Sequence, residues 1–169
     1  MDLVSEPRTV VCPGSYDPVT NGHLDIISRT SAQFDRVVVG VVNQPIRKQK
    51  TVFTADERQA FLEQATVELG NVEVRVFSNL VVEFAREMGA SAIVKGLRAI
   101  SDFEYESEMA QLNKKLDPEI ESIYVFARPS YSFLSSTGVK EMATFGADIS
   151  DLVPAPVAAA LADRLERDQ

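Results

Sequence analysis

Short apolar segments alternate with stretches of helical periodicity along the sequence, and this alternation restricts the fold more than any other feature. The apolar segments, which are typical of buried strands, cover residues 8–14, 36–43, 71–77, 91–96 and 121–127. The helical segments cover residues 23–34, 54–69, 80–89, 101–116, 135–146 and 154–167. Strands separated by helices form parallel sheets with right-handed crossovers. The sequence therefore predicts an α/β fold, a Rossmann-like, doubly wound, parallel five-stranded sheet with helices on both faces.

The length of the chain, 169 residues, suits one domain of ordinary size. The sequence contains no repeat, low-complexity tract or linker that would mark a domain boundary. We expect a single domain over residues 1–169, with a core over about 8–146 and a C-terminal helix over about 154–167.

The charge and composition of the chain exclude several classes of partner. The net charge is -8, so the surface as a whole repels nucleic acids and anionic membranes, and an anionic substrate would need a local basic pocket. No apolar run approaches the roughly 18 residues of a membrane helix, and the first residues, MDLVSEPR, lack the apolar stretch of a signal peptide. The single cysteine, Cys12, excludes an internal disulfide and fits a reducing compartment. We expect a cytoplasmic protein that binds neither nucleic acid nor membrane.

Most of the unusual residues directly follow a predicted strand. Ligands of parallel α/β sheets bind beyond the carboxyl ends of the strands, so these positions share one edge of the sheet. They are residues 13–23, 44–50, 80–81, 95–98 and 129–137. The sequence has no G-x-x-x-x-G-K-[ST] motif, and no G-x-G-x-x-G follows the first strand. We therefore expect neither a P-loop nor a nicotinamide or flavin site.

The segment after the first strand, PGSYDPVTNGH, ends in His23, the only histidine of the chain. Gly14 would let the backbone approach a ligand, and the Ser15 hydroxyl can donate to a phosphate oxygen. Gly22 and His23 stand at the start of a helix, whose first N–H groups and dipole favour anions. The segment indicates a phosphate site; the alternative is an ordinary strand-to-helix connection with an exposed histidine.

Lys95-Gly96-Leu97-Arg98 places two cations around a glycine at the end of a buried strand. A lysine at such a position is costly to bury without an anionic partner, so the motif suits a bound phosphate. The alternative is pairing with a Glu or Asp side chain, for instance that of Asp102 or Glu104.

Three hydroxyls, Ser135, Ser136 and Thr137, stand where a helix begins, and Lys140 follows one turn later. One hydroxyl would cap the helix, and an ordinary N-cap is the alternative interpretation. Three in a row exceed what capping needs, so they indicate an anion site.

The loop Arg47-Lys48-Gln49-Lys50 is basic and follows the second strand. Taken alone it is best interpreted as a solvated charge run, but its position borders the same edge of the sheet. Glycines, hydroxyls and cations thus gather at one edge of a protein with a net charge of -8. This clustering predicts a site for a highly anionic nucleotide.

Three segments, CPGSYDPVTNGH, VKGLRAISDFEYE and YSFLSSTGVKE, resemble the bacterial phosphopantetheine adenylyltransferases, a family of the nucleotidyltransferase superfamily, with T-x-G-H and S-S-T-x-V-K motifs. The resemblance extends over about residues 9–155. It implies reversible adenylyl transfer from ATP to 4′-phosphopantetheine, giving dephospho-coenzyme A and pyrophosphate, the penultimate step of coenzyme A biosynthesis. It also implies Mg²⁺ accompanying ATP without dedicated protein ligands, a homohexamer, and coenzyme A as a feedback inhibitor.

The resemblance also implies which residues act. The catalytic residues would be Ser15, His23, Lys95 and Arg98. The ATP site would comprise Ser15, Tyr16, His23, Gly96, Leu97, Arg98, Glu106, Tyr131, Ser132, Phe133, Leu134, Ser135, Ser136 and Thr137. The phosphopantetheine site would comprise Ser15, Arg47, Lys48, Leu80, Val81, Lys95, Met109, Leu112 and Asn113. In these sets Lys95 would bind the phosphate of phosphopantetheine, and Glu106 would lie near the ribose or base of the nucleotide.

The sequence departs from the usual pattern of the family at a few positions. The family has a lysine in the loop after the second strand, and either Arg47 or Lys48 could fill that role here. Tyr16 replaces a more common phenylalanine, and Gly138 replaces an apolar residue. Because a glycine inside a helix costs up to about 1 kcal/mol, we expect a looser start of that helix.

The implied reaction needs no general base, because the attacking phosphate is already anionic near pH 7, its second pKa being about 6. Two other functions stay open at this point. A related transferase acting on nicotinate mononucleotide is one, although the KGLR and FEYE segments argue against it. A non-catalytic nucleotide or coenzyme A sensor is the other, and it would require a broken motif, whereas His23, Arg98 and residues 135–137 are intact.

Overall fold

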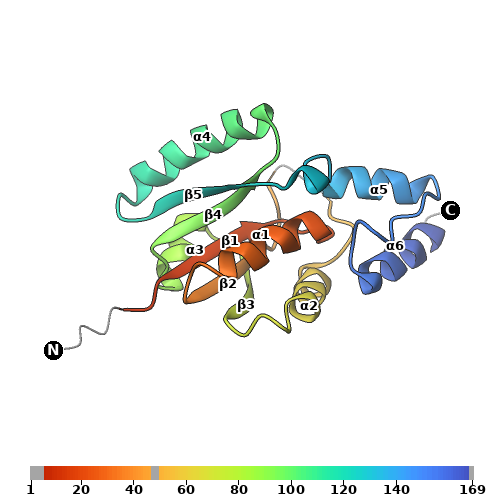
Figure 1. The fold of residues 1–169 in the computed structure, drawn as a ribbon, viewed down its shortest axis with the longest axis horizontal. Coiled ribbons are helices and arrows are strands. Elements are labelled where there is room, and N and C mark those ends of the chain that lie inside the picture. The colour runs from red at the N-terminus through yellow and green to blue at the C-terminus, as the bar shows by residue number, and fades with distance from the viewer. Residues whose placement is uncertain (1–5, 47–49, 168–169) are drawn as a thin grey trace.

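Five parallel strands form one sheet in the computed structural model, which describes residues 6–46 and 50–167 (Figure 1). The strands are β1 (Thr9–Gly14), β2 (Arg36–Val42), β3 (Val72–Phe77), β4 (Ala92–Leu97) and β5 (Glu121–Phe126). Their order across the sheet is β3-β2-β1-β4-β5, and Val10 of β1 is in register with Val37 on one side and Ala92 on the other. The chain therefore runs outward from β1 to β3 and then returns to the other side of β1, as a doubly wound sheet does.

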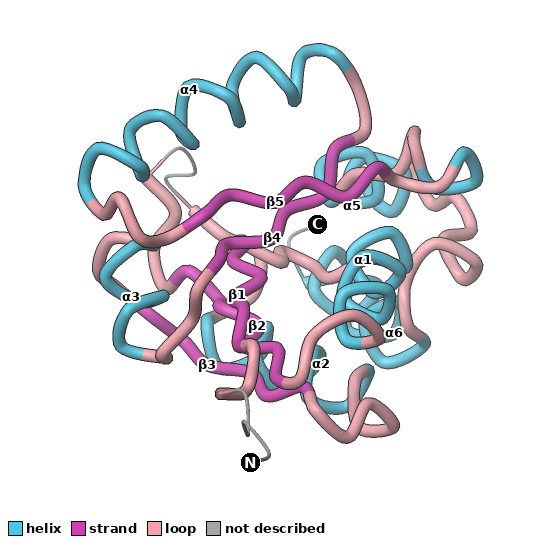
Figure 2. Tube along the Cα trace, turned by 60° about the vertical axis from the view of Figure 1, so that its left-hand side comes forward, coloured by secondary structure: helices cyan, strands magenta, loops and turns pink. Residues whose placement is uncertain are grey.

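The helices cover both faces of this sheet. They are α1 (Asn21–Ser31), α2 (Ala55–Ala65), α3 (Val81–Glu87), α4 (Ile100–Leu116), α5 (Ser136–Thr144) and α6 (Ala155–Arg167). Figure 2 shows α3 on one face and α1, α2 and α6 on the other, while α4 lies along the β5 side. None of these helices is long and apolar enough to cross a membrane.

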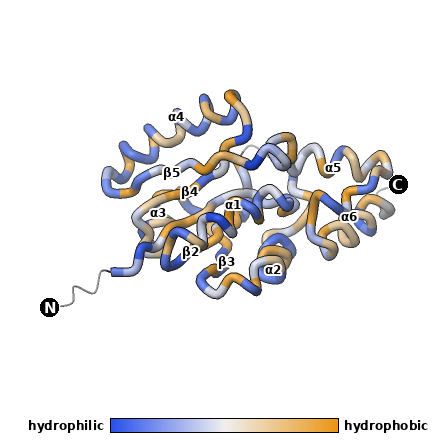
Figure 3. Tube along the Cα trace, viewed as in Figure 1, coloured by the Kyte–Doolittle hydropathy of each residue, from blue (hydrophilic) through white to orange (hydrophobic). Residues whose placement is uncertain are grey.

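Two apolar clusters lie on opposite faces of the sheet, because successive strand residues point to opposite sides. Val10 belongs to the larger cluster and its neighbour Val11 to the smaller one. The larger cluster takes its helical residues from α1, α2, α5 and α6, and the smaller one from α3. Figure 3 shows orange, apolar residues along the strands between the helices. This arrangement confirms the predicted fold class.

The ends of the helices differ from the prediction by a few residues. α1 begins at Asn21 rather than at 23, because Thr20 is its N-cap. α2 ends at Ala65 rather than at 69, since the chain turns there and the Leu69 N–H donates to the Thr66 carbonyl. A short 3-10 helix, η1 (Pro129–Tyr131), was not predicted.

One glycine of β2, Gly40, is required by packing. The rings of Phe77 and Phe84 stack with their centroids 4.4 Å apart and an angle of 10° between their planes. A Cβ at Gly40 would lie 2.6 Å from Cε1 of Phe84 and 3.0 Å from Cε1 of Phe77. The absence of a side chain thus allows the Phe84 ring of α3 to reach the sheet.

We expect Gly40→Ala to lower the free energy of unfolding by about 1–3 kcal/mol, the usual cost of overpacking a core. Gly70→Ala is the matched control, because no atom lies within 4 Å of the position that its Cβ would take. That variant should be no less stable than the wild type. Urea denaturation of both variants measures the difference, and a Gly40→Ala protein as stable as the wild type would contradict the packing argument.

Candidate active site

The candidate site lies where the order of strands reverses, at the carboxyl ends of β1 and β4. These two strands are neighbours in the sheet, although β2 and β3 lie between them in the sequence. The segment that follows β1 therefore meets the segment that follows β4. This switch point is the usual place of a ligand in an open parallel sheet.

The turn after β1 has a fixed shape. Tyr16 has a φ of 50°, which is uncommon outside glycine, and its ring is buried. Its hydroxyl donates to the Cys12 carbonyl at 2.9 Å, and burial raises the pKa of the phenol well above its usual range. A Cβ at Gly14 would lie 3.0 Å from Cε2 of Tyr16. Close packing of the Tyr16 ring therefore gives a second reason for a glycine at position 14, besides the predicted approach of a ligand.

His23 is part of the cap of α1 and also faces the turn. The Thr20 backbone N–H donates to Nδ1 of His23 at 3.0 Å, while the His23 N–H donates back to the Thr20 hydroxyl. The His23 ring packs edge-on against Tyr16, with 5.0 Å between centroids. Because Nδ1 accepts a hydrogen bond, the proton of the neutral ring is assigned to Nε2, which makes Nε2 a donor. The two interpretations of this histidine, as a cap and as a functional group, are thus compatible.

The two cations after β4 are both paired with carboxylates of α4. Nζ of Lys95 lies 2.7 Å from Oε1 of Glu106, and Nε of Arg98 lies 3.3 Å from Oδ2 of Asp102. The alternative interpretation of this motif, pairing with Asp or Glu side chains, is therefore observed: Asp102 binds Arg98, whereas Lys95 binds Glu106 rather than one of the two acids named as examples. The reason is geometric: Asp102 lies closer in sequence to Arg98 and binds it, whereas Glu106, one turn further along α4, reaches Lys95.

The hydroxyls before α5 have different partners. Ser135 is the N-cap, and its oxygen accepts from the Gly138 N–H at 3.0 Å. The Ser136 hydroxyl donates to the Pro18 carbonyl at 2.8 Å, and Thr137 is exposed. Two of the three hydroxyls, those of Ser135 and Ser136, therefore make hydrogen bonds within the protein. Gly138 takes part in the cap, so the structure gives no sign of the looser helix start that we expected.

Hydrogen bonds and packing contacts join the three segments that follow β1, follow β4 and precede α5. Nη1 of Arg98 donates to the Leu134 carbonyl at 2.9 Å, which joins the segment after β4 to the segment before α5. The Ser136 hydroxyl joins the latter to the turn after β1. Gly22 packs close to Leu134 and Tyr131, the nearest atoms lying 3.5 Å and 3.6 Å from the position of its Cβ. Ser15, His23, Arg98 and residues 131–137 thus border one region.

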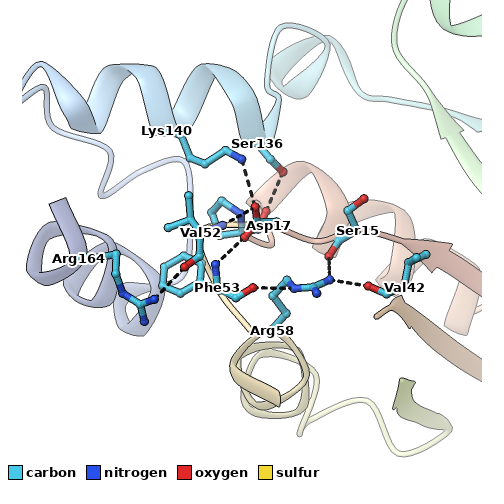
Figure 4. Close-up of polar contacts among 10 residues, drawn as sticks. Ser15, Asp17, Val42, Val52, Phe53, Arg58, Ser136, Lys140 and Arg164 are labelled. Carbon is cyan, nitrogen blue, oxygen red and sulfur yellow. Dashed lines mark hydrogen bonds and ion pairs between the residues drawn. The ribbon is translucent and has the colours of Figure 1, made fainter. Parts of the chain in front are cut away.

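A buried ion network, which the sequence did not reveal, supports this region (Figure 4). Asp17 is completely buried, and its carboxylate accepts from the Val52 and Phe53 N–H groups at 3.0 and 2.9 Å. Nζ of Lys140 lies 3.2 Å from the same carboxylate. Lys140 therefore belongs to the scaffold rather than to the anion site in which the sequence placed it. The network ties the turn after β1 to the chain before α2 and to α5.

Arg58 of α2 is the second part of this network. Its side chain is buried, and it donates to the carbonyls of Ser15, Val42, Asn43 and Phe53 at 2.7 to 3.2 Å. Burial lowers the pKa of its guanidinium, and the nearby Asp17 opposes this effect. The guanidinium remains charged at neutral pH, since its ordinary pKa is far higher. Arg58 fixes the carbonyl of Ser15 and thereby the direction of the peptide in the turn after β1.

The residues expected for the pantetheine arm lie at α3 and α4. Leu80 precedes α3 and is half exposed, and Val81 begins that helix. Met109, Leu112 and Asn113 lie on α4, which neighbours α3. Arg47 and Lys48 lie outside the described residues.

Two further features concern Cys12 and the arrangement of the described acidic groups. Burial of Cys12 raises the pKa of its thiol to about 12, so the thiol is not a nucleophile at neutral pH. Within residues 6–46 and 50–167, no three His, Cys, Asp or Glu side chains are grouped in a way that could hold a metal ion.

Comparisons with known proteins give consistent matches. A model of the cytidylyltransferase-like family matches residues 11–142. The phosphopantetheine adenylyltransferase of Alkaliphilus metalliredigens is 48% identical over 154 residues, which are 91% of this chain and 97% of the relative. Those of Heliobacterium modesticaldum and Clostridium tetani are 48% and 50% identical, over 91% and 85% of this chain and 90% and 89% of the relatives.

A solved structure from Vibrio parahaemolyticus, assigned as a nicotinate-nucleotide adenylyltransferase, matches with a TM-score of 0.66 over 96% of both chains. Its sequence is 14% identical, so this similarity shows the fold alone.

We expect Asp17→Asn to lower the free energy of unfolding by about 3 kcal/mol, because it leaves the half-buried Lys140 without its counter-ion and places an amide against N–H donors. Asp163→Asn, an exposed change on α6 with the same loss of charge, is the control and should stay within about 0.5 kcal/mol of the wild type. Urea denaturation at neutral pH measures both. Equal losses in the two variants would show that the Asp17 network does not stabilise the fold.

Proposed function

The chain belongs to the phosphopantetheine adenylyltransferase family of cytidylyltransferase-like proteins, and from this premise we propose that it catalyses reversible adenylyl transfer from ATP to 4′-phosphopantetheine. The products are dephospho-coenzyme A and pyrophosphate, and the step is the penultimate one of coenzyme A biosynthesis. One observation of the structure carries the proposal: hydroxyl, imidazole and cationic donors from three separate segments meet at the switch point between β1 and β4.

The chemistry of the reaction fits a site made of donors. An oxygen of the phosphate monoester attacks the α-phosphorus of ATP, a new P–O bond forms, and the bond from the α-phosphorus to the bridging oxygen breaks as pyrophosphate leaves. The attacking oxygen is already anionic, so no residue has to remove a proton from it. What the protein must supply is alignment of two polyanions and stabilisation of charge on the transferred group.

The residues divide these tasks between them. Lys95 would hold the phosphate of phosphopantetheine, and Ser15 would bridge it to the α-phosphate of ATP. Arg98 and the N-terminus of α5 would take the β- and γ-phosphates, and His23 would donate from Nε2 to the phosphate oxygens. The hydrogen bond from Thr20 to Nδ1 supports this role, because it keeps the ring oriented with its donor side fixed.

Four further properties are proposed with this function. Mg²⁺ would arrive with ATP as part of the substrate, and coenzyme A, which combines the features of both substrates, would compete for the site. A homohexamer is supported by the surface of α4 and β5: α4 has no buried residue, Phe103 and Leu116 of α4 are 58% and 54% exposed, and Phe126 of β5 is 77% exposed. Figure 3 shows apolar residues along α4 beside polar ones. A cytoplasmic location follows from the substrates.

A coupled assay for pyrophosphate release tests the proposal. With ATP and Mg²⁺, we expect turnover with 4′-phosphopantetheine and none above background with nicotinate mononucleotide. Turnover with nicotinate mononucleotide but not with 4′-phosphopantetheine would replace the proposed substrate. Turnover with neither acceptor would favour a protein that binds nucleotides without catalysis. The site alone does not distinguish the two acceptors, so the choice depends on the 48–50% identity to the phosphopantetheine enzymes.

We expect His23→Ala to lower kcat by roughly 10²–10³, as loss of one transition-state donor does, with a much smaller effect on ATP binding. His23→Glu separates catalysis from capping, because glutamate is a usual residue at this position of a capping box and, when ionised, offers no donor to a phosphate. It should retain the thermal stability of the wild type but not its kcat. Steady-state kinetics and thermal unfolding measure the two properties. A near-normal kcat in either variant would remove His23 from the mechanism.

A further inference from the structure

Both cations of the segment after β4 are held by one face of α4. Asp102 and Glu106 stand four residues apart on that helix and therefore on the same side of it. Asp102 accepts from the Nε of Arg98 at 3.3 Å and from the Arg98 backbone N–H at 3.1 Å. Glu106 lies 2.7 Å from Nζ of Lys95. Each cation that the mechanism assigns to a phosphate thus has one carboxylate of α4 as its partner.

The Lys95–Glu106 pair is the more shielded of the two. The Glu106 side chain is 12% exposed and that of Lys95 is 32% exposed, against 27% and 39% for Asp102 and Arg98. The second oxygen of Glu106, Oε2, is buried and has no hydrogen-bond partner among the described residues. A buried carboxylate oxygen without a donor is unfavourable, so Glu106 gains from any ligand that brings an N–H or O–H group to it.

The charges of this small group cancel. Two cations face two carboxylates, so an approaching anion meets little net attraction from the pair of ion pairs. The anion must share Lys95 with the Glu106 carboxylate or displace that carboxylate from the lysine. In both cases the carboxylate repels the anion at short range. A ligand that carries hydroxyl or amide donors besides its phosphate can satisfy Oε2, whereas a bare polyanion cannot.

We propose that Asp102 and Glu106 are specificity-determining residues that weaken the binding of bare polyanions to Lys95 and Arg98, so that affinity depends on the uncharged parts of the substrates. The inference rests on the proposed function, in which these cations bind substrate phosphates. Discrimination of this kind uses repulsion of the wrong ligand as well as attraction of the right one. It would limit how far inorganic phosphate fills the site.

Isothermal titration of the full chain with inorganic pyrophosphate, without Mg²⁺, tests the proposal directly, because this probe has no sugar, base or pantetheine arm. We expect Glu106→Gln and Asp102→Asn each to bind pyrophosphate about fivefold more tightly than the wild type, the upper range for a partly exposed ion pair. Glu108→Gln is the matched control, an exposed change on the same helix with the same change in net charge. It should stay within about twofold of the wild type, since distant exposed charges are screened.

A double-mutant cycle with Lys95→Met shows whether Glu106 acts through the lysine. In that background Glu106→Gln should have no larger effect than Glu108→Gln. Unchanged or weaker pyrophosphate binding in Glu106→Gln, or no binding by the wild type and all variants, would overturn the proposal and leave Glu106 as a residue that merely orients Lys95. The titration involves no turnover, so its outcome is separate from that of the adenylyl-transfer assay, on which the proposed function stands or falls.

Discussion

The buried guanidinium of Arg58 is the interaction on which the candidate site depends. Within residues 6–46 and 50–167, Arg58 is the only arginine that is fully buried. It binds four backbone carbonyls rather than a carboxylate. These carbonyls belong to the ends of β1 and β2, the following loop and the chain before α2. Figure 4 shows three of the partners, Ser15, Val42 and Phe53. A carbonyl at the end of a parallel strand has no partner strand beyond it, so a donor must come from elsewhere. Arg58 supplies several such donors at once and thereby holds the turn after β1 in shape.

Asp17 completes this arrangement from the other side of the turn. Its carboxylate binds two N–H groups of the chain before α2 and the ammonium group of Lys140, and it lies close enough to Arg58 to oppose the loss of the arginine's charge. One carboxylate thus lies close to two cations, so the group of three side chains keeps one net positive charge beneath the turn. In a chain of net charge -8, this local excess of positive charge would favour the anionic substrates of the proposed function.

The alternation of apolar and helical segments predicted the fold because each buried strand must be β-branched and apolar on both faces, as RVVVGVV of β2 is. The segments at the carboxyl ends were also predicted, since a parallel sheet brings those ends together. Side-chain pairing was not predictable in the same way. Lys95 could reach several acids of α4, and only the phase of the helix relative to β4 selects Glu106. Arg58 stands in ERQAFLEQ, where its type suggests solvent, and no local pattern reveals that its helix turns it inward.

His23 shows how the two demands on one position select a residue type. At this position of a capping box the usual residue is glutamate or glutamine, whose side chain accepts from the N-cap N–H. A glutamate would fulfil that task and place a negative charge beside the phosphates. A histidine accepts through Nδ1 and donates through Nε2, on opposite sides of one rigid ring. The cap therefore orients the donor, and the donor's direction depends on the same Thr20 hydrogen bond that begins α1. In the proposed function, one side chain would thus serve both the start of the helix and phosphate recognition, and this imidazole would not need to move a proton.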